Sequence, residues 1–95
     1  MDSFKDRVAV VTGGGSGIGR ALVLALAREG ARVVLADVDE AAMDGVAREA
    51  RELGVQALTV RTDVSDLGSV QALAERAWQG FGGVHVLCNN AGVAL

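Results

Sequence analysis

The 95-residue chain contains no proline and no tyrosine, and it has a single cysteine, Cys88, and a single histidine, His85. One cysteine can form neither an internal disulfide nor a thiolate metal site, and His85 has no partner ligand at a suitable spacing. We therefore expect no disulfide scaffold and no metal site. We also expect Cys88, His85 and Trp78 to pack as structural residues, with Cys88 buried and Trp78 covering the flank of its helix.

Clustered positive charge and long hydrophobic runs are also missing. The net charge is −3, and the basic residues are scattered singly along the sequence. No apolar run approaches the roughly 18 residues that span a bilayer, and residues 1–7 lack the basic-then-apolar order of a signal peptide. We therefore expect neither nucleic acid nor a membrane as a partner, and we expect a cytoplasmic location.

The remaining composition is that of one soluble globular domain, with 51% apolar and 22% charged residues. Short stretches rich in β-branched residues alternate with longer segments of helical periodicity. Strands are predicted at residues 7–12, 32–37, 56–62 and 84–89, and helices at 17–29, from an Asp39 cap to Gly54, and from a Ser65 or Asp66 cap to Phe81. Strands that alternate with helices pair in parallel through right-handed crossovers.

The pattern of apolar residues predicts how these elements are arranged. Strands one, two and four are continuous apolar runs, typical of strands covered on both faces, whereas strand three alternates and is expected at an edge. We therefore predict the N-terminal half of a Rossmann-type doubly wound parallel α/β sheet, βαβαβαβ with strand order 3-2-1-4, as one domain over residues 1–95. On the first helix, the buried face is expected to contain Ile18, Leu22, Ala25 and Leu26.

The strongest motif is the glycine-rich segment at residues 12–19, which joins the first strand to the first helix. Glycines there permit a sharp turn, a close approach of the backbone to a pyrophosphate, and close packing of the helix on its strand. The free N–H groups and partial positive charge of the helix N-terminus can then hold the anion. A P-loop is excluded, because the segment ends Gly19-Arg20-Ala21 and lacks the Lys-Ser/Thr pair. The G-x-G-x-x-G pattern fails in every register.

The spacing is instead Thr-Gly-x-x-x-Gly-x-Gly, formed by Thr12, Gly13, Gly17 and Gly19. It resembles the cofactor loop of the classical short-chain dehydrogenase/reductase family. Three further motifs agree in order and position: Asp37 ends the second strand, Asp63-Val64 follows the third, and Asn89-Asn90-Ala91-Gly92 follows the fourth. This resemblance covers essentially the whole chain and implies an NAD(P)-dependent oxidoreductase that acts on an alcohol or carbonyl substrate and forms a homo-oligomer at full length.

Asp37 indicates which cofactor is preferred. It lies about 20 residues beyond the glycine loop, where a carboxylate can accept hydrogen bonds from the adenosine ribose hydroxyls. The same charge would repel the 2′-phosphate of NADP, and neither Ser16 nor Val38 offers a basic side chain in compensation. We therefore expect NAD to be preferred. A helix cap is the alternative role for Asp37, although Asp39 can serve there instead.

By the same resemblance, Asp63 and Val64 contact the adenine, and the backbone of residues 90–92 passes close to the cofactor ribose. Asp63 could also cap the third helix, and both roles could hold together; residues 89–92 could also form an ordinary turn. The complete set of expected cofactor-binding residues is Gly13, Gly15, Ser16, Gly17, Ile18, Gly19, Asp37, Asp63, Val64, Asn90, Ala91 and Gly92.

No catalytic residue is expected within these 95 residues. The family uses a tyrosine and a lysine four residues later, whereas this chain has no tyrosine and its one lysine, Lys5, precedes the first strand. We therefore expect the chain to be the N-terminal part of a longer enzyme and to be inactive alone. The alternative is a short product that binds NAD or an adenylate without catalysis, or that pairs with a partner through the exposed apolar edge of strand four.

Overall fold

The computed structural model describes residues 4–90 of the chain. Its elements alternate in the order β1 (Val8–Thr12), α1 (Gly17–Arg28), β2 (Arg32–Asp37), α2 (Glu40–Glu52), β3 (Ala57–Arg61), α3 (Leu67–Phe81) and β4 (Val86–Asn89). The four strands form one parallel sheet in the order β3-β2-β1-β4. The predicted half of a Rossmann-type sheet, with strand order 3-2-1-4, is therefore confirmed.

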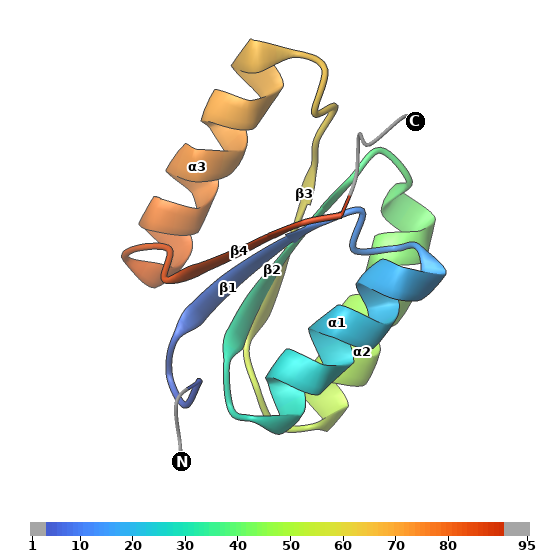
Figure 1. Cartoon of the computed structure of the whole chain (residues 1–95), viewed down its shortest axis with the longest axis vertical. Coiled ribbons are helices and arrows are strands. Elements are labelled where there is room, and N and C mark those ends of the chain that lie inside the picture. The colour runs from blue at the N-terminus through green and yellow to red at the C-terminus, as the bar shows by residue number, and fades with distance from the viewer. Residues whose placement is uncertain (1–3, 91–95) are drawn as a thin grey trace.

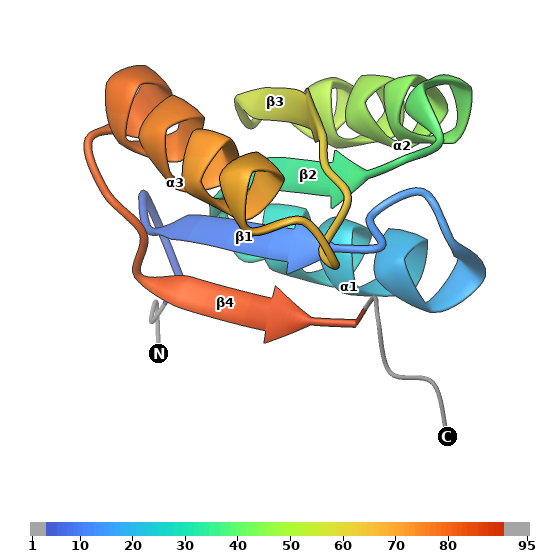
Figure 2. The same ribbon diagram turned by 90° about the horizontal axis from the view of Figure 1, so that it is seen from above.

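The sheet is the middle of three layers (Figure 1). Helices α1 and α2 cover one face and α3 covers the other, and Figure 2 shows the two sides from above. Each face has its own apolar cluster. The cluster under α1 and α2 includes Val11, Val33 and Met43, and the cluster under α3 includes Val10, Leu73 and Ala77. The carboxyl ends of all four strands meet at one edge, where loops can gather functional groups.

Side chains at the helix starts explain where the helices begin. Ser16 caps α1 and accepts from the Gly19 N–H; Asp39 caps α2 and accepts from the Ala42 N–H. Asp66 caps the start of α3, which ends at Phe81. Its C-cap is Gly82, whose left-handed φ of 79° suits a residue without a Cβ. The caps at Asp39 and Asp66 were both predicted, and Asp39 takes the capping role that was the alternative reading of Asp37.

The predicted buried face of α1 is confirmed for Leu26 and, in part, for the half-buried Leu22, and it is wrong for the other two residues. Ile18 is 70% exposed and Ala25 is exposed, whereas Val23, Leu26 and Ala27 are buried against the sheet. Because almost every position of this helix is apolar, its sequence does not define one stripe. The rotation is set instead where Gly19 meets the backbone of the preceding loop, and residues 19, 23, 26 and 27 share that inward face.

The α3 side of the sheet is incompletely covered. Strand β4 is less buried than its apolar sequence predicts: Leu87 is 63% exposed, and Cys88 is only half-buried instead of buried. Trp78, expected to cover the flank of α3, is 67% exposed. The reason is that β4 lies at the sheet edge and a single helix covers this face, so the outward side of both elements has no packing partner among residues 4–90.

Within residues 4–90, no helix is both long enough and apolar enough to cross a membrane.

Candidate nucleotide-binding site

The glycine loop lies where β1 ends, between its neighbours β2 and β4. Gly13 turns the chain with a φ of 66°, a left-handed conformation that a residue without Cβ adopts freely. Its N–H donates to the Ala36 carbonyl at 2.6 Å, which ties the loop to β2. The Ser16 hydroxyl donates to the Gly13 carbonyl at 2.8 Å and accepts from the Gly19 N–H at 3.1 Å. The loop is therefore braced by its own hydrogen bonds.

Packing explains why three positions of the loop require glycine. A Cβ on Gly14 would lie 2.9 Å from the Leu35 Cβ, and one on Gly15 would lie 2.7 Å from the Ala42 Cβ. At Gly19 the Cβ would lie only 1.8 Å from the Gly13 carbonyl oxygen. Gly17 differs, because a Cβ there would meet no atom within 4 Å. The protein itself has no packing reason for a glycine at position 17.

The start of α1 presents backbone donors into this open space. The first N–H groups of an α-helix have no carbonyl partner within the helix. Ser16 accepts from the N–H of Gly19, and the N–H groups of Gly17 and Ile18 have no acceptor among residues 4–90. Together with the partial positive charge of the helix end, these donors form an anion site that needs no lysine. Both residues are exposed, as a ligand contact requires.

Asp37, at the end of β2, lies directly beside the loop. Its Oδ2 accepts from the Gly15 N–H at 3.0 Å, and its Oδ1 accepts from the Asp39 N–H at 3.1 Å. The side chain is half-buried, so its carboxylate remains accessible at the mouth of the site. Gly15 was predicted to bind the cofactor, but its N–H is directed to Asp37 and is not among the donors that the helix start presents.

Asp63 and Val64 follow β3, the strand next to β2. Their segment continues alongside β2, because the Thr62 N–H donates to the Asp37 carbonyl at 2.9 Å. The hydroxyl and backbone N–H of Ser65 both donate to the Asp63 carboxylate, and these bonds lower the pKa of Asp63 below its ordinary value. Asp66, and not Asp63, caps α3.

A cavity of about 240 Å³ lies between the end of β1, the start of α3 and the end of β4. Its lining residues are Thr12, Val64, Val70, Leu73, Leu87 and Asn89. Val64 therefore lines a cavity at the same edge of the sheet as the glycine loop.

The end of β4 joins the site through Asn90. Its side-chain Nδ2 donates to the Ser16 Oγ at 3.1 Å and approaches the Gly13 carbonyl at 3.4 Å, and its backbone N–H donates to the Thr12 Oγ1 at 2.8 Å. The Thr12 hydroxyl in turn donates to the Asn89 Oδ1 at 3.0 Å. The structure thus brings Asn90 to the glycine loop. The predicted Ala91 and Gly92 lie outside the described residues.

Thr12 is the first residue of the glycine-loop motif but was not among the expected cofactor-binding residues. It is 5% exposed and connects β1 to the end of β4. A hydroxyl at the last position of an otherwise apolar strand was the available signal, because a buried polar group requires a partner. We expect Thr12→Val, which keeps the shape and removes the acceptor of the Asn90 N–H, to lower the free energy of unfolding by about 2 kcal/mol.

This loss can be measured by urea unfolding followed by circular dichroism. Thr59→Val is the matched control, since Thr59 lies half-buried on edge strand β3, and its effect is expected to stay within about 0.5 kcal/mol. Equal losses in the two variants would show that the Thr12 hydroxyl has no special role.

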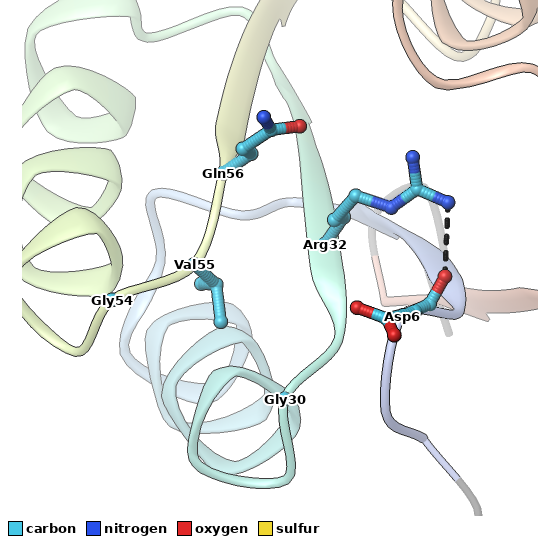
Figure 3. Close-up of a pocket in the computed structure, with 6 residues that line it drawn as sticks. All are labelled: Asp6, Gly30, Arg32, Gly54, Val55 and Gln56. Carbon is cyan, nitrogen blue, oxygen red and sulfur yellow. Dashed lines mark hydrogen bonds between the residues drawn. The ribbon is translucent and has the colours of Figure 1, made fainter.

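A second cavity, of about 490 Å³, lies at the opposite edge of the sheet, where the strands begin (Figure 3). It is lined by Asp6, Gly30, Arg32, Gly54, Val55 and Gln56. Arg32 reaches across it to the Asp6 carbonyl at 2.9 Å, with its guanidinium 5.4 Å from the centre of the Phe81 ring. The carboxyl ends of α1 and α2 lie here, and their partial negative charge disfavours a phosphate.

Within residues 4–90, no cluster of three or more His, Cys, Asp or Glu side chains could hold a metal ion.

Parallel strands in the order 3-2-1-4, with a glycine loop that opens a helix where the order reverses, define the nucleotide-binding half of a doubly wound α/β protein. Residues 7–95 match the family described as short chain dehydrogenase. The chain belongs to this family, as its motifs predicted.

Individual relatives agree with this assignment. The chain is 55% identical, over 98% of its length, to cis-4-hydroxycyclohexanecarboxylate dehydrogenase of Sinomonas cyclohexanicum, of which it covers 37%. Among solved structures, it matches a short-chain dehydrogenase/reductase of Burkholderia phymatum in complex with NAD (48% identity, TM-score 0.87, 92% of this chain and 31% of that one). It also matches an NAD⁺-bound xylitol dehydrogenase (36% identity, TM-score 0.91, 95% and 35%). The chain therefore spans about a third of the length of these relatives.

Proposed function

We propose that this chain binds NAD across the carboxyl edge of its sheet and forms the cofactor-binding part of an oxidoreductase that acts on an alcohol or carbonyl. The observation that carries the proposal is the open space at Gly17. Packing explains Gly14, Gly15 and Gly19, whereas the missing side chain at Gly17 leaves room beside two N–H donors that have no acceptor among residues 4–90, as the approach of a pyrophosphate requires.

Each part of the nucleotide has a group to bind it. Gly17 and Ile18 would donate to the pyrophosphate, Asp37 would accept from the adenosine ribose, and Asp63 with Val64 would contact the adenine. The backbone near Asn90 would pass beside the second ribose. When bound, the nicotinamide would supply the hydride acceptor or donor, and these residues would hold and orient the dinucleotide.

The carboxylate of Asp37 favours NAD over NADP in this proposal. It is half-buried at the end of β2. Neither Val38, which follows it in the sequence, nor Ser16, which precedes Gly17 in the loop, is basic. A 2′-phosphate would therefore meet a negative charge, with no cation at either of these two positions to compensate. The NAD named in the two solved relatives supports the same cofactor.

Several properties of the complete enzyme are also proposals. These are a small-molecule alcohol or carbonyl substrate, a homo-oligomeric assembly and a cytoplasmic location. The dehydrogenases among its relatives support the first of these. Because none of residues 4–90 is assigned a part in the transfer of hydride or proton, we propose that the chain alone binds the cofactor without turnover.

Calorimetric titration with NAD tests the proposal. We expect the wild-type chain to bind NAD and Gly17→Ala to bind it about tenfold more weakly, because the added methyl group occupies the space where the pyrophosphate approaches. The fold should be retained, since a Cβ at Gly17 meets no protein atom within 4 Å.

Gly45→Ala is the matched control. Gly45 is an exposed glycine of α2 whose Cβ would also meet nothing within 4 Å, and it lies away from the loop. We expect this variant to bind NAD as the wild type does and to gain about 0.5–1 kcal/mol in the free energy of unfolding. Wild-type affinity in Gly17→Ala, or no NAD binding by the wild type, would contradict the proposal.

A further inference from the structure

The carboxylate of Asp37 already has two hydrogen-bond partners within the protein. Its Oδ2 accepts from the Gly15 N–H at 3.0 Å, and its Oδ1 accepts from the Asp39 N–H at 3.1 Å. Gly15 belongs to the glycine loop and Asp39 is the N-cap of α2. One side chain therefore joins the loop that follows β1 to the helix that follows β2. A residue that only reads the ribose would not need either bond.

The packing around Gly15 shows how close this junction is. A Cβ on Gly15 would lie 2.7 Å from the Ala42 Cβ, 3.1 Å from the Asp37 Oδ2 and 3.1 Å from the Met43 nitrogen. The loop backbone thus rests directly on the first turn of α2, and the Asp37 carboxylate lies at the contact. Hydrogen bonds to a charged acceptor are stronger than neutral ones, so this acceptor is well suited to hold a backbone segment in place.

We infer that Asp37 is also a positioning residue: its carboxylate anchors the Gly15 amide and holds the glycine loop against α2 before any nucleotide binds. The part of this inference that concerns nucleotide affinity rests on the proposed function. The anchored loop then fixes where the N–H groups of Gly17 and Ile18 point. Loss of the anchor should weaken ligands that bind the loop, including ligands without ribose hydroxyls for Asp37 to recognise.

Amide hydrogen exchange at Gly15, followed by NMR, tests the anchor without any ligand. We expect the Gly15 amide to exchange about tenfold faster in Asp37→Ala, which removes the acceptor, than in the wild type. Asp37→Asn keeps one neutral acceptor oxygen, which can face the Gly15 N–H, and loses the bond from the Asp39 N–H, so it should retain part of the protection. Asp44→Ala is the matched control, because it removes an exposed carboxylate from α2 and should leave Gly15 unchanged. Equal exchange in the wild type and Asp37→Ala would overturn the inference.

Affinities for ADP and 2′,3′-dideoxy-ADP test the effect on binding. The dideoxy compound keeps the pyrophosphate and lacks both ribose hydroxyls. We expect Asp37→Ala to weaken dideoxy-ADP about tenfold, or about 1.4 kcal/mol, and Asp37→Asn to stay within about twofold of the wild type.

Two other outcomes separate the inference from the proposed function. If Asp37→Ala weakened ADP but left dideoxy-ADP unchanged, Asp37 would read only the ribose, and the inference would be overturned while the proposed function stood. If the wild type bound neither these nucleotides nor NAD, the proposed function would fail, and the exchange at Gly15 would decide the anchor alone.

Discussion

The Gly19→Ala substitution is expected to lower the free energy of unfolding by about 3 kcal/mol or more. The new methyl carbon would lie 1.8 Å from the Gly13 carbonyl oxygen and 2.7 Å from its carbon. Both atoms belong to the backbone of a loop that is tied to β2, so neither can move aside as a flexible side chain would. Overpacking of a core costs about 1–3 kcal/mol when the surrounding side chains can adjust. The clash here is with backbone atoms, so the cost should reach or exceed the upper end of that range.

Urea unfolding of Gly19→Ala and Gly17→Ala would measure this effect. The two variants add the same methyl group to the same first turn of α1, but only position 19 lacks the space for it. Gly17→Ala is expected to unfold at the wild-type urea concentration or slightly above it, because alanine favours a helix more than glycine does. Equal stability of the two variants would show that the helix shifts to accommodate a Cβ at residue 19.

The second large effect concerns the choice between NAD and NADP. We expect the wild-type chain to bind NAD more tightly by a factor between about five and about a thousand. Two like charges about 4 Å apart repel by about 1 kcal/mol in water and about 4 kcal/mol at an effective dielectric constant of 20, and each 1.4 kcal/mol is a factor of ten. Asp37→Asn removes the charge, retains an acceptor for the Gly15 N–H, and should bring the two affinities within a few-fold of each other.

Asp39→Asn provides the control for this experiment. It makes the same change of charge two residues away, and asparagine caps a helix about as well as aspartate does, so α2 should keep its start. We expect its preference for NAD to be close to that of the wild type. If both variants lost the preference equally, the net charge of the region would be responsible and not a contact with the 2′-phosphate. Competitive titration of both cofactors gives the ratio directly.

The order of the strands could be predicted because it depends on patterns of apolar residues that are visible in a single sequence. Alternating strands and helices imply parallel pairing, and the alternation in β3 marks an edge. The orientation of α1 was not predictable in the same way. Its buried residues follow from one contact, that of Gly19 with the Gly13 backbone, which acts between segments and leaves no periodic signal. Starting from Gly19 as the contact point would have given Val23, Leu26 and Ala27.

The site shows the same division. The glycine loop and Asp37 were predicted from their spacing and Asn90 from the family resemblance, and the structure places them at one edge of the sheet. Their roles toward a nucleotide remain proposals. The bonds of Thr12 to residues 89 and 90 depend on how β4 lies beside β1, and those of Asp37 depend on how the loop rests on α2. Contacts of this kind become visible only once the chain has folded.

The position of β4 also bears on when the site can form during synthesis. Asn90 and Gly13, which approach each other beside the loop, are separated by 77 residues of sequence. At ordinary rates of translation, the ribosome needs on the order of 10 s to extend the nascent chain from one to the other. The glycine loop can dock on β2 and α2 well before that, because Asp37 follows Gly15 by only 22 residues. The nascent protein is therefore expected to spend seconds with an anchored loop and no β4 beside it, a period in which the exposed edge of β1 is open to a chaperone.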